Sequence, residues 1–227
     1  TLIMKVLFIS SGNSVNGISP IITNQGESLK KNGISISFFT IRGKGLVGYL
    51  KSIWSIRKKI KNEKFDIVHA HYSFSGFAAA LAGAKPLVVS LMGSDVKANW
   101  YRRFIVKVVN SLFWTSTIVK SDDMKKAICI KKALVIPNGV DCNKFYPINK
   151  EEALNHTMWD KNKRHILFAA NSDRYVKNFK LAKRAFELIN KPNIELHSLR
   201  NIKNKYMPFY INAADVVLLT SLWEGSP

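Results

Sequence analysis

Short apolar runs alternate along the chain with longer segments in which apolar residues recur every three or four positions. The short runs are rich in Val, Ile and Phe, as is typical of β-strands, and their nearly continuous hydrophobicity predicts strands buried on both faces of a parallel sheet. Six such strands are predicted first, and three more follow after a break. They cover residues 5–10, 34–41, 66–72, 87–93, 117–121 and 133–137, and then residues 165–171, 194–199 and 216–221.

The longer segments between these runs have the period of amphipathic helices. Helices are predicted for residues 20–31, 46–61, 74–82, 100–113, 179–189 and 204–213. Strands that alternate with helices in this way form parallel sheets through right-handed crossovers. The predicted fold class is therefore α/β, with two Rossmann-like, doubly wound parallel-sheet domains.

The break between the two series covers residues 138–152, which include Gly139 and Pro147 and show little apolar periodicity. We interpret it as a hinge between an N-terminal domain, residues 1–147, and a C-terminal domain, residues 148–227. The second series stops just beyond a strand, where a parallel sheet still needs a covering helix. We therefore expect the second domain to be incomplete.

The charge is concentrated in the first part of the chain. The net charge is +20, and residues 1–150 carry 23 basic and 7 acidic side chains, against 12 and 8 in residues 151–227. A surface this basic attracts nucleic acid, an anionic membrane leaflet or phosphorylated substrates. No recognised nucleic-acid-binding motif is present, so we expect no specific nucleic-acid partner.

Residues 46–61 combine an apolar stripe (Leu46, Tyr49, Ile53, Ile56 and Ile60) with Trp54 beside it and a crowd of Lys and Arg elsewhere. The pattern suits a helix at a membrane interface, and it equally suits a helix that packs on the sheet with a solvated basic face. No apolar stretch reaches the ~18–20 residues of a transmembrane helix, and no signal peptide is recognisable. Cys129 and Cys142 lack metal or redox spacing. We expect a cytoplasmic protein, peripheral at the inner face of a membrane.

Candidate chemistry in the first series follows the ends of three strands, where ligands bind in open α/β sheets. Gly17 lies in a polar loop before a helix that begins at Pro20. This combination is typical of a phosphate-binding site and equally of a plain turn. His71 ends the third strand, and Ser94 and Asp95 follow the fourth. Ser94 and Asp95 are interpreted either as caps of the next helix or as partners of a substrate hydroxyl.

In the second series, Arg174 and Lys177 stand between a strand and a helix, where cations suit a diphosphate. Glu224 follows the last predicted strand and could accept hydrogen bonds from sugar hydroxyls, although surface placement without a role is the common fate of such residues.

The order of two motifs is more specific than any single residue. The chain has Ile-Pro-Asn-Gly-Val-Asp-x3-Phe-x-Pro at 136–147 and Ala-Ala-Asp-Val-x-Leu-x-x-Ser-x-x-Glu-Gly-x-Pro at 213–227. With these motifs the sequence resembles the family-4 retaining glycosyltransferases, which have the GT-B fold and act in polysaccharide, glycolipid and glycoprotein assembly.

The resemblance implies a nucleotide-diphosphate sugar, UDP- or GDP-linked, as donor and a glycan or lipid-linked acceptor, with no cofactor and no metal. It implies that Lys177, Arg174 and Glu224 are catalytic. The donor would also be bound by Gly17, Asn138, Gly225 and Ser226, and the acceptor-side cleft would contain His71, Ser94 and Asp95.

Three positions depart from the family pattern. Met92 stands where many members have a histidine, Ser172 stands where the arginine before the phosphate lysine is usual, and a second glutamate after Glu224 would fall beyond Pro227. The main alternative to an enzyme is therefore a truncated, non-catalytic fragment that binds an acceptor or a membrane.

Overall fold

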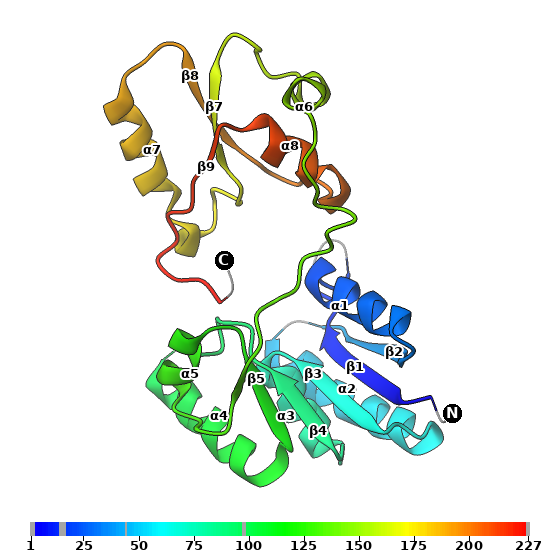
Figure 1. The fold of residues 1–227 in the computed structure, drawn as a ribbon. Coiled ribbons are helices and arrows are strands. Elements are labelled where there is room, and N and C mark those ends of the chain that lie inside the picture. Colours follow the sequence, from blue (N-terminus) through cyan, green and yellow to red (C-terminus); the bar gives the residue numbers. More distant parts are fainter. Residues whose placement is uncertain (1–2, 14–16, 44, 97–98, 226–227) are drawn as a thin grey trace. The chain divides into compact units, whose positions relative to one another are not determined.

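The computed structural model describes residues 3–13, 17–43, 45–96 and 99–225 (Figure 1). The chain divides into two compact units: the first comprises the residues up to Gly139 together with Gly225, and the second comprises residues 140–224. Each unit is an α/β fold with its own parallel sheet. Among the described residues, no helix has the length and apolar character needed to cross a membrane.

The first unit is built on a six-stranded sheet in the order β2-β1-β3-β4-β5-β6, and each neighbouring pair is parallel. The strands are β1 (Lys5–Ser11), β2 (Ser35–Ile41), β3 (Ile67–His71), β4 (Leu87–Ser90), β5 (Ser116–Val119) and β6 (Leu134–Val135). Because β1 lies inside the sheet, residues 6–10 are all buried. The strand order reverses beside β1, which places the loops after β1 and β3 at the switch point where such sheets bind ligands.

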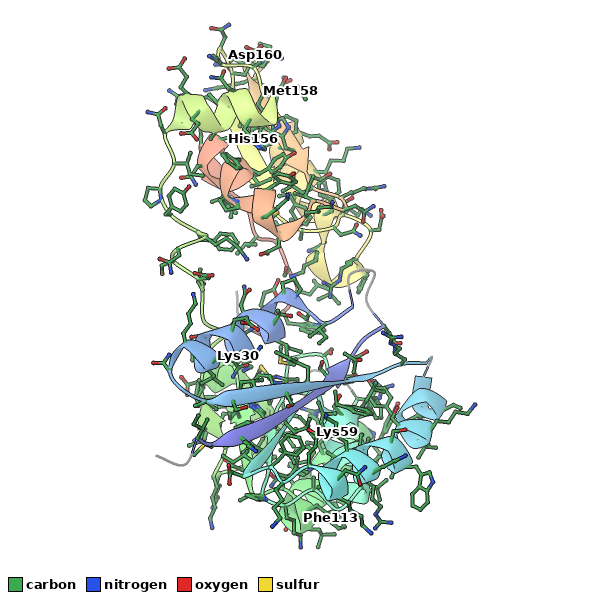
Figure 2. The ribbon with its side chains drawn as sticks, turned by 90° about the vertical axis from the view of Figure 1, so that its right-hand side faces the viewer. Lys30, Lys59, Phe113, His156, Met158 and Asp160 are labelled. Atoms are coloured by element: carbon green, nitrogen blue, oxygen red, sulfur yellow. The ribbon has the colours of Figure 1, made fainter. Side chains whose placement is uncertain are left out.

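Alternate residues of β1 face two different cores. Val6 and Phe8 pack under α1 (Pro20–Lys31), whereas Leu7 and Ile9 face the helices on the other side. Those helices are α2 (Gly45–Asn62), α3 (Ser73–Leu81), α4 (Trp100–Phe113) and α5 (Asp122–Ile128). Figure 2 shows α1, which carries Lys30, across the sheet from α2, which carries Lys59.

The second unit has the strand order β8-β7-β9, again parallel. Its elements are α6 (Lys150–Thr157), β7 (Arg164–Phe168), the 3₁₀ turn η1 (Tyr175–Lys177), α7 (Phe179–Ile189), β8 (Ile194–Ser198), η2 (Asn204–Tyr206), α8 (Met207–Ala213) and β9 (Val216–Val217). Leu154 and Ala213 join α6 to α8. Asp215 ties this layer to the sheet, because it accepts hydrogen bonds from Lys150, from Arg164 and from the amide of His165.

The helix bounds predicted for residues 20–31, 100–113 and 179–189 are confirmed. Several predicted strands are too long: the fourth ends at Ser90, the sixth at Val135, the seventh at Phe168 and the last at Val217. The prediction that every strand is buried on both faces is wrong for two strands. β8 is mostly half-buried and β9 is exposed, because both lie at the edges of their sheet. The predicted hinge runs too far, since α6 begins at Lys150 after Asn149, whose side chain accepts the amides of the first turn.

Candidate functional site

Two loops leave the carboxyl edge of the second sheet and meet at an ion pair. The loop after β7 carries Arg174 and Lys177, and the loop after β9 carries Glu224. Lys177 Nζ lies 2.5 Å from Glu224 Oε1, although 47 residues separate them in the sequence. The two side chains are 17% and 25% exposed, so both are held by the fold and both are still reachable from solvent.

Hydrogen bonds between the two loops fix this geometry. The amide of Leu222 donates to the carbonyl of Val176 over 2.9 Å. The hydroxyl of Thr220 lies 3.1 Å and 3.0 Å from the carbonyl oxygens of Lys177 and Asn178. Asn178 has a φ of 51° and turns the chain from η1 directly into α7. Lys177 is therefore presented at the beginning of a helix.

The electrostatics of this edge favour an anionic ligand. Burial alone would raise the pKa of Glu224, but interactions with Lys177 and Ser221 and the charge of Arg174 bring it below its usual value. Glu224 is thus ionised at neutral pH and partly neutralises the cations. No side chain of the described residues caps the first turn of α7, and this turn carries no acidic residue. A helix N-terminus of this kind, flanked by a lysine, can bind phosphate oxygens.

The carboxyl edge of the first sheet is built differently, around Asp95. This side chain is 2% exposed, and its oxygens accept the amides of Ser73 (3.1 Å), Met92 (3.0 Å) and Gly93 (3.0 Å). Burial raises the pKa of Asp95, and the backbone hydrogen bonds only partly offset the rise. The interpretation of Asp95 as a cap of the following helix is wrong: α4 begins after Asn99, and Asp95 instead fastens the loop after β4 to the start of α3.

Below this loop lies a buried polar group: His69, His71 and Lys120. The two imidazoles stack with centroids 4.3 Å apart, and His69 Nε2 lies 2.8 Å from Ser90 Oγ. Burial, reinforced by the charge of Lys120, lowers the pKa of His69 to about 4. Burial, His69 and Lys120 together lower the pKa of His71 well below its usual value. Both rings are therefore neutral at pH 7, and His71 Nε2 has no hydrogen-bond partner among the described residues.

Hydroxyl groups stand at the outer side of the same edge. Tyr72 directly follows β3 and has a φ of 83°, which is strained for a residue with a side chain. Strain of this kind is common at functional sites. Burial and the charge of Asp95 raise the pKa of Tyr72, and the exposed hydroxyl of Ser94 beside it opposes the rise. Burial also raises the pKa of Tyr49, with Ser11 and Ser75 beside it. Neutral hydroxyls of this kind can donate hydrogen bonds to a polyhydroxylated ligand.

Known proteins resemble this chain both in sequence and in fold. The sequence profile of Glycosyltransferase Family 4 matches residues 19–144. The chain belongs to this family. The matched range contains His71, Ser94, Asp95 and Asn138 and ends before Lys177 and Glu224.

This family-4 chain is 30% identical over 235 residues to the UDP-Gal:alpha-D-GlcNAc-diphosphoundecaprenol alpha-1,3-galactosyltransferase of Escherichia coli. The alignment covers 82% of the chain and 59% of the length of that relative.

Solved structures also resemble this family-4 chain. Sucrose-phosphate synthase from Thermosynechococcus elongatus has a TM-score of 0.72 at 12% identity, covering 99% of this chain and 77% of that one. Anabaena HepE in complex with UDP and glucose has a TM-score of 0.67 at 14% identity, covering 98% and 75%. At these identities the likeness shows the fold alone, and it confirms the Rossmann-like GT-B class.

The remaining predicted donor residues of the family-4 chain are less informative. Gly17 has a φ of 78°, a conformation that a side chain would strain, although a Cβ there would meet nothing within 4 Å. Asn138 is half-buried in the segment after β6, and Gly225 is buried. Ser226 lies outside the described residues.

Sequence reasoning missed Lys120, Tyr49 and Tyr72. Lys120 and Tyr72 each come directly after a buried strand, a position that could have drawn attention to them. Tyr49 was assigned to the apolar stripe of its helix, and its hydroxyl reaches the end of β1.

Proposed function

We propose that this chain is part of an enzyme that transfers a sugar from a UDP-sugar to a lipid-linked glycan, with retention of the anomeric configuration. The observation that carries the proposal is the meeting of Lys177, Arg174 and Glu224 at one sheet edge beside the start of α7. The name of the Escherichia coli relative, which includes a UDP-sugar and a diphosphoundecaprenol acceptor, supports both substrate classes.

In this mechanism the cations act on the leaving group. Lys177 and Arg174 stabilise the charge that develops on the departing diphosphate, together with the amides at the start of α7. Glu224 accepts hydrogen bonds from hydroxyls of the donor sugar, and it releases part of its pairing with Lys177 when the phosphates arrive. We favour UDP over GDP as the leaving nucleotide, because the name of the Escherichia coli relative includes UDP-Gal and HepE was solved in complex with UDP.

The first unit provides the acceptor side. Tyr72 and Ser94 offer hydroxyls to the acceptor, while His71 and Asp95 shape the edge beneath them. A retaining transfer in which the acceptor attacks from the leaving-group side requires no separate general base. The neutral imidazoles and the fully engaged carboxylate of Asp95 are consistent with that route.

A membrane surface is the proposed setting, because two helices of the first unit turn apolar side chains outward. Trp100, Phe104 and Leu112 of α4 are 74%, 61% and 66% exposed. On the inner side of this helix Arg103 donates to the carbonyl of Ala127, and Asn110 bonds to Thr117. An apolar stripe that faces away from the core, on a strongly cationic unit, matches an anionic lipid surface.

Helix α2 contributes a second apolar strip on the same side of the sheet. Four residues of its predicted apolar stripe pack against the core: Tyr49, Ile53, Ile56 and Ile60. The fifth, Leu46, is exposed. The exposed apolar side chains of α2 are Leu46, Val47, Leu50 and Trp54.

Sugar transfer tests the first part of the proposal. The purified chain is incubated with UDP-galactose, UDP-glucose or GDP-mannose and a synthetic GlcNAc-diphospholipid, and the product linkage is determined by NMR. Lys177→Ala should lower kcat/KM about 10²–10³-fold, as the loss of one preorganised electrostatic partner does elsewhere. Lys183→Ala, which removes an exposed cation from α7 beyond its first turn, is the control and should leave kcat/KM unchanged.

Equal turnover by Lys177→Ala and the unchanged chain would contradict the assignment. An inverted product linkage would remove the retaining mechanism. Absence of transfer from all three donors would favour the non-catalytic, acceptor- or membrane-binding alternative.

Vesicle binding tests the membrane setting separately. Vesicles of phosphatidylglycerol and phosphatidylcholine should retain the chain, and vesicles of phosphatidylcholine alone should not. Trp100→Ser with Phe104→Ser should abolish retention. The control, Met158→Ser with Leu188→Ser, removes two even more exposed apolar side chains from the second unit and should bind normally. Equal binding to both vesicle types would contradict an electrostatic membrane contact.

A further inference from the structure

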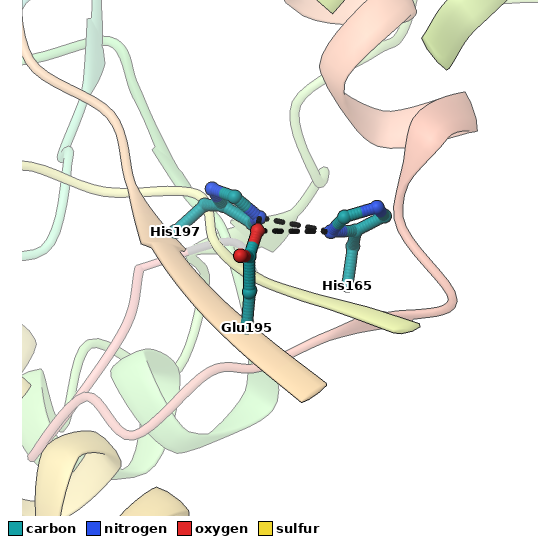
Figure 3. A group of neighbouring side chains, drawn as sticks. All are labelled: His165, Glu195 and His197. Atoms are coloured by element: carbon teal, nitrogen blue, oxygen red, sulfur yellow. Dashed lines mark hydrogen bonds and ion pairs between the residues drawn. The ribbon is translucent and has the colours of Figure 1, made fainter. Parts of the chain in front are cut away.

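Three side chains that are typical metal ligands converge on one face of the second sheet (Figure 3). His165 lies on the central strand β7, and Glu195 and His197 lie on the edge strand β8. In the parallel register His165 stands opposite Glu195, and Glu195 and His197 point to the same face because they are two residues apart. This cluster is separate from the loops that carry Lys177 and Glu224.

The distances among the three ligand atoms suit a single ion. His165 Nδ1 lies 3.0 Å from His197 Nε2 and 3.9 Å from Glu195 Oε2, and His197 Nε2 lies 3.6 Å from the same oxygen. Zinc binds histidine nitrogen and carboxylate oxygen at about 2.0–2.2 Å in tetrahedral geometry, which separates ligand atoms by about 3.3–3.5 Å. The observed triangle needs only small side-chain adjustments to meet that requirement.

The surroundings hold each ligand in the state that a metal requires. His165 Nε2 lies 2.9 Å from the carbonyl oxygen of Asp160, which can only accept, so Nε2 carries the proton and the lone pair of Nδ1 faces the cluster. Glu195 Oε1 is paired with Lys163 at 2.5 Å, which leaves Oε2 for the histidines. The ring of Trp159 stacks on His197 at a centroid distance of 3.7 Å and restricts its rotation.

A plain hydrogen bond from His197 to His165 is the simpler account of the shortest contact. It leaves unexplained why Glu195 Oε2 is directed at both rings. A divalent cation would satisfy all three ligand atoms at once.

We propose that His165, Glu195 and His197 form a binding site for a divalent transition-metal ion of the zinc type, with a fourth position left for water. The ion would tie the edge strand β8 to the central strand β7. Its role is therefore structural or regulatory within the second unit, and the proposal does not depend on sugar transfer.

Metal binding is measured directly on the whole chain. Cys129 and Cys142 are exposed and would bind zinc themselves, so a Cys129→Ser/Cys142→Ser background is used. Competition with a chromophoric chelator should give one Zn²⁺ per chain, and Co²⁺ should give the intense visible absorption of a tetrahedral site. His197→Gln and Glu195→Gln, which change partly exposed side chains, should each weaken binding at least about tenfold.

His156→Gln is the control, because it removes another histidine of the same unit that stacks on Phe209 away from the cluster. It should bind zinc as the background chain does. Absence of stoichiometric Zn²⁺ binding, or unchanged affinity in His197→Gln and Glu195→Gln, would overturn the proposal. Circular dichroism at neutral pH establishes that each variant is folded, so that a loss of affinity is not a loss of structure.

Discussion

The carboxyl edges of the two sheets use their carboxylates in opposite ways. Asp95 in the first unit is 2% exposed and gives its oxygens to three backbone amides, whereas Glu224 in the second unit is partly exposed and gives its carboxylate to side chains. Burial raises the pKa of Asp95, while Lys177, Ser221 and Arg174 outweigh burial and lower that of Glu224. Backbone partners cannot be exchanged for a ligand without unfolding the loop, but side-chain partners can. The first edge therefore provides a rigid frame, and the second provides charges that a substrate can recruit.

The largest expected effect concerns the buried histidines of the first unit. The pKa of His69 is about 4 in the folded chain and about 6.5 when unfolded, so the unfolded state binds more protons between these values. Acidification from pH 7 to pH 4 should therefore lower the free energy of unfolding of this unit by about 3 kcal/mol through His69 alone. Urea unfolding at several pH values, followed by hydrogen exchange of β3 peptides, measures the change.

His69→Gln, which retains a polar partner for Ser90, should show a shallower pH dependence over the same range. Protonation of Asp95 acts in the opposite direction, since its pKa is raised in the folded state. An identical pH dependence in His69→Gln would mean that the pKa of His69 is the same in the folded and unfolded states.

A frame built on backbone hydrogen bonds should be costly to break. Asp95→Ala leaves the amides of Ser73, Met92 and Gly93 without their acceptor, and should lower the free energy of unfolding by about 3 kcal/mol. Ser94→Ala, at the exposed neighbouring position, should change it by less than about 0.5 kcal/mol. Chemical denaturation of both variants tests the contrast, and equal losses would show that Asp95 has no special structural role.

Much of this contrast lies beyond what the sequence can predict. Apolar runs located the strands, and apolar periodicity gave the bounds of α1, α4 and α7. Periodicity does not reveal which side of α4 faces the core, because Val106 and Phe104 are equally apolar. The sequence also placed Lys177 and Glu224 after separate strands, but their ion pair depends on β7 and β9 being neighbours in the sheet.

Two helices were missed although their caps were visible. Ser121 precedes Asp122 and Asp123 at the start of α5, and Asn149 precedes Glu151 and Glu152 in α6. Both are strong N-terminal signals, but each helix is too short to show an apolar period. The burial of Lys120 and Asp95 could not be predicted, because charged residues are rarely buried and only the packed fold supplies their surroundings.

Asp215 in the second unit should make stability depend on pH in the opposite direction to Asp95, because its pKa is lowered in the folded state and that of Asp95 is raised. Burial tends to raise the pKa of Asp215, but Lys150, the amide of His165 and Arg164 lower it well below the usual value. Its contribution is present above the unfolded pKa of about 3.9 and is lost as the pH falls below it. Asp215→Asn should therefore cost about 2 kcal/mol of unfolding free energy at pH 6, and progressively less below pH 4.

The control for this prediction is Asp173→Asn, which removes an exposed ion pair with Arg200 and should cost less than about 0.5 kcal/mol. Urea denaturation, followed by hydrogen exchange of peptides from β7, measures the free energy of unfolding of both variants. A difference between Asp215→Asn and the unchanged chain that stays constant down to pH 3 would show that the charge of Asp215 is not what stabilises the unit.

The smallest expected change in stability is the most informative about function. Glu224→Gln removes the charge opposite Lys177 but keeps a similar shape, and a partly exposed ion pair contributes at most about 1 kcal/mol. The free energy of unfolding should therefore fall by less than that amount, while the rate of sugar transfer falls far more, because an amide accepts hydrogen bonds from sugar hydroxyls less strongly than a carboxylate does. Urea denaturation and transfer assays on the same preparation separate the two effects. If stability and transfer fell in parallel, Glu224 would belong to the frame, as Asp95 does, and the difference between the two edges would be one of solvent exposure alone.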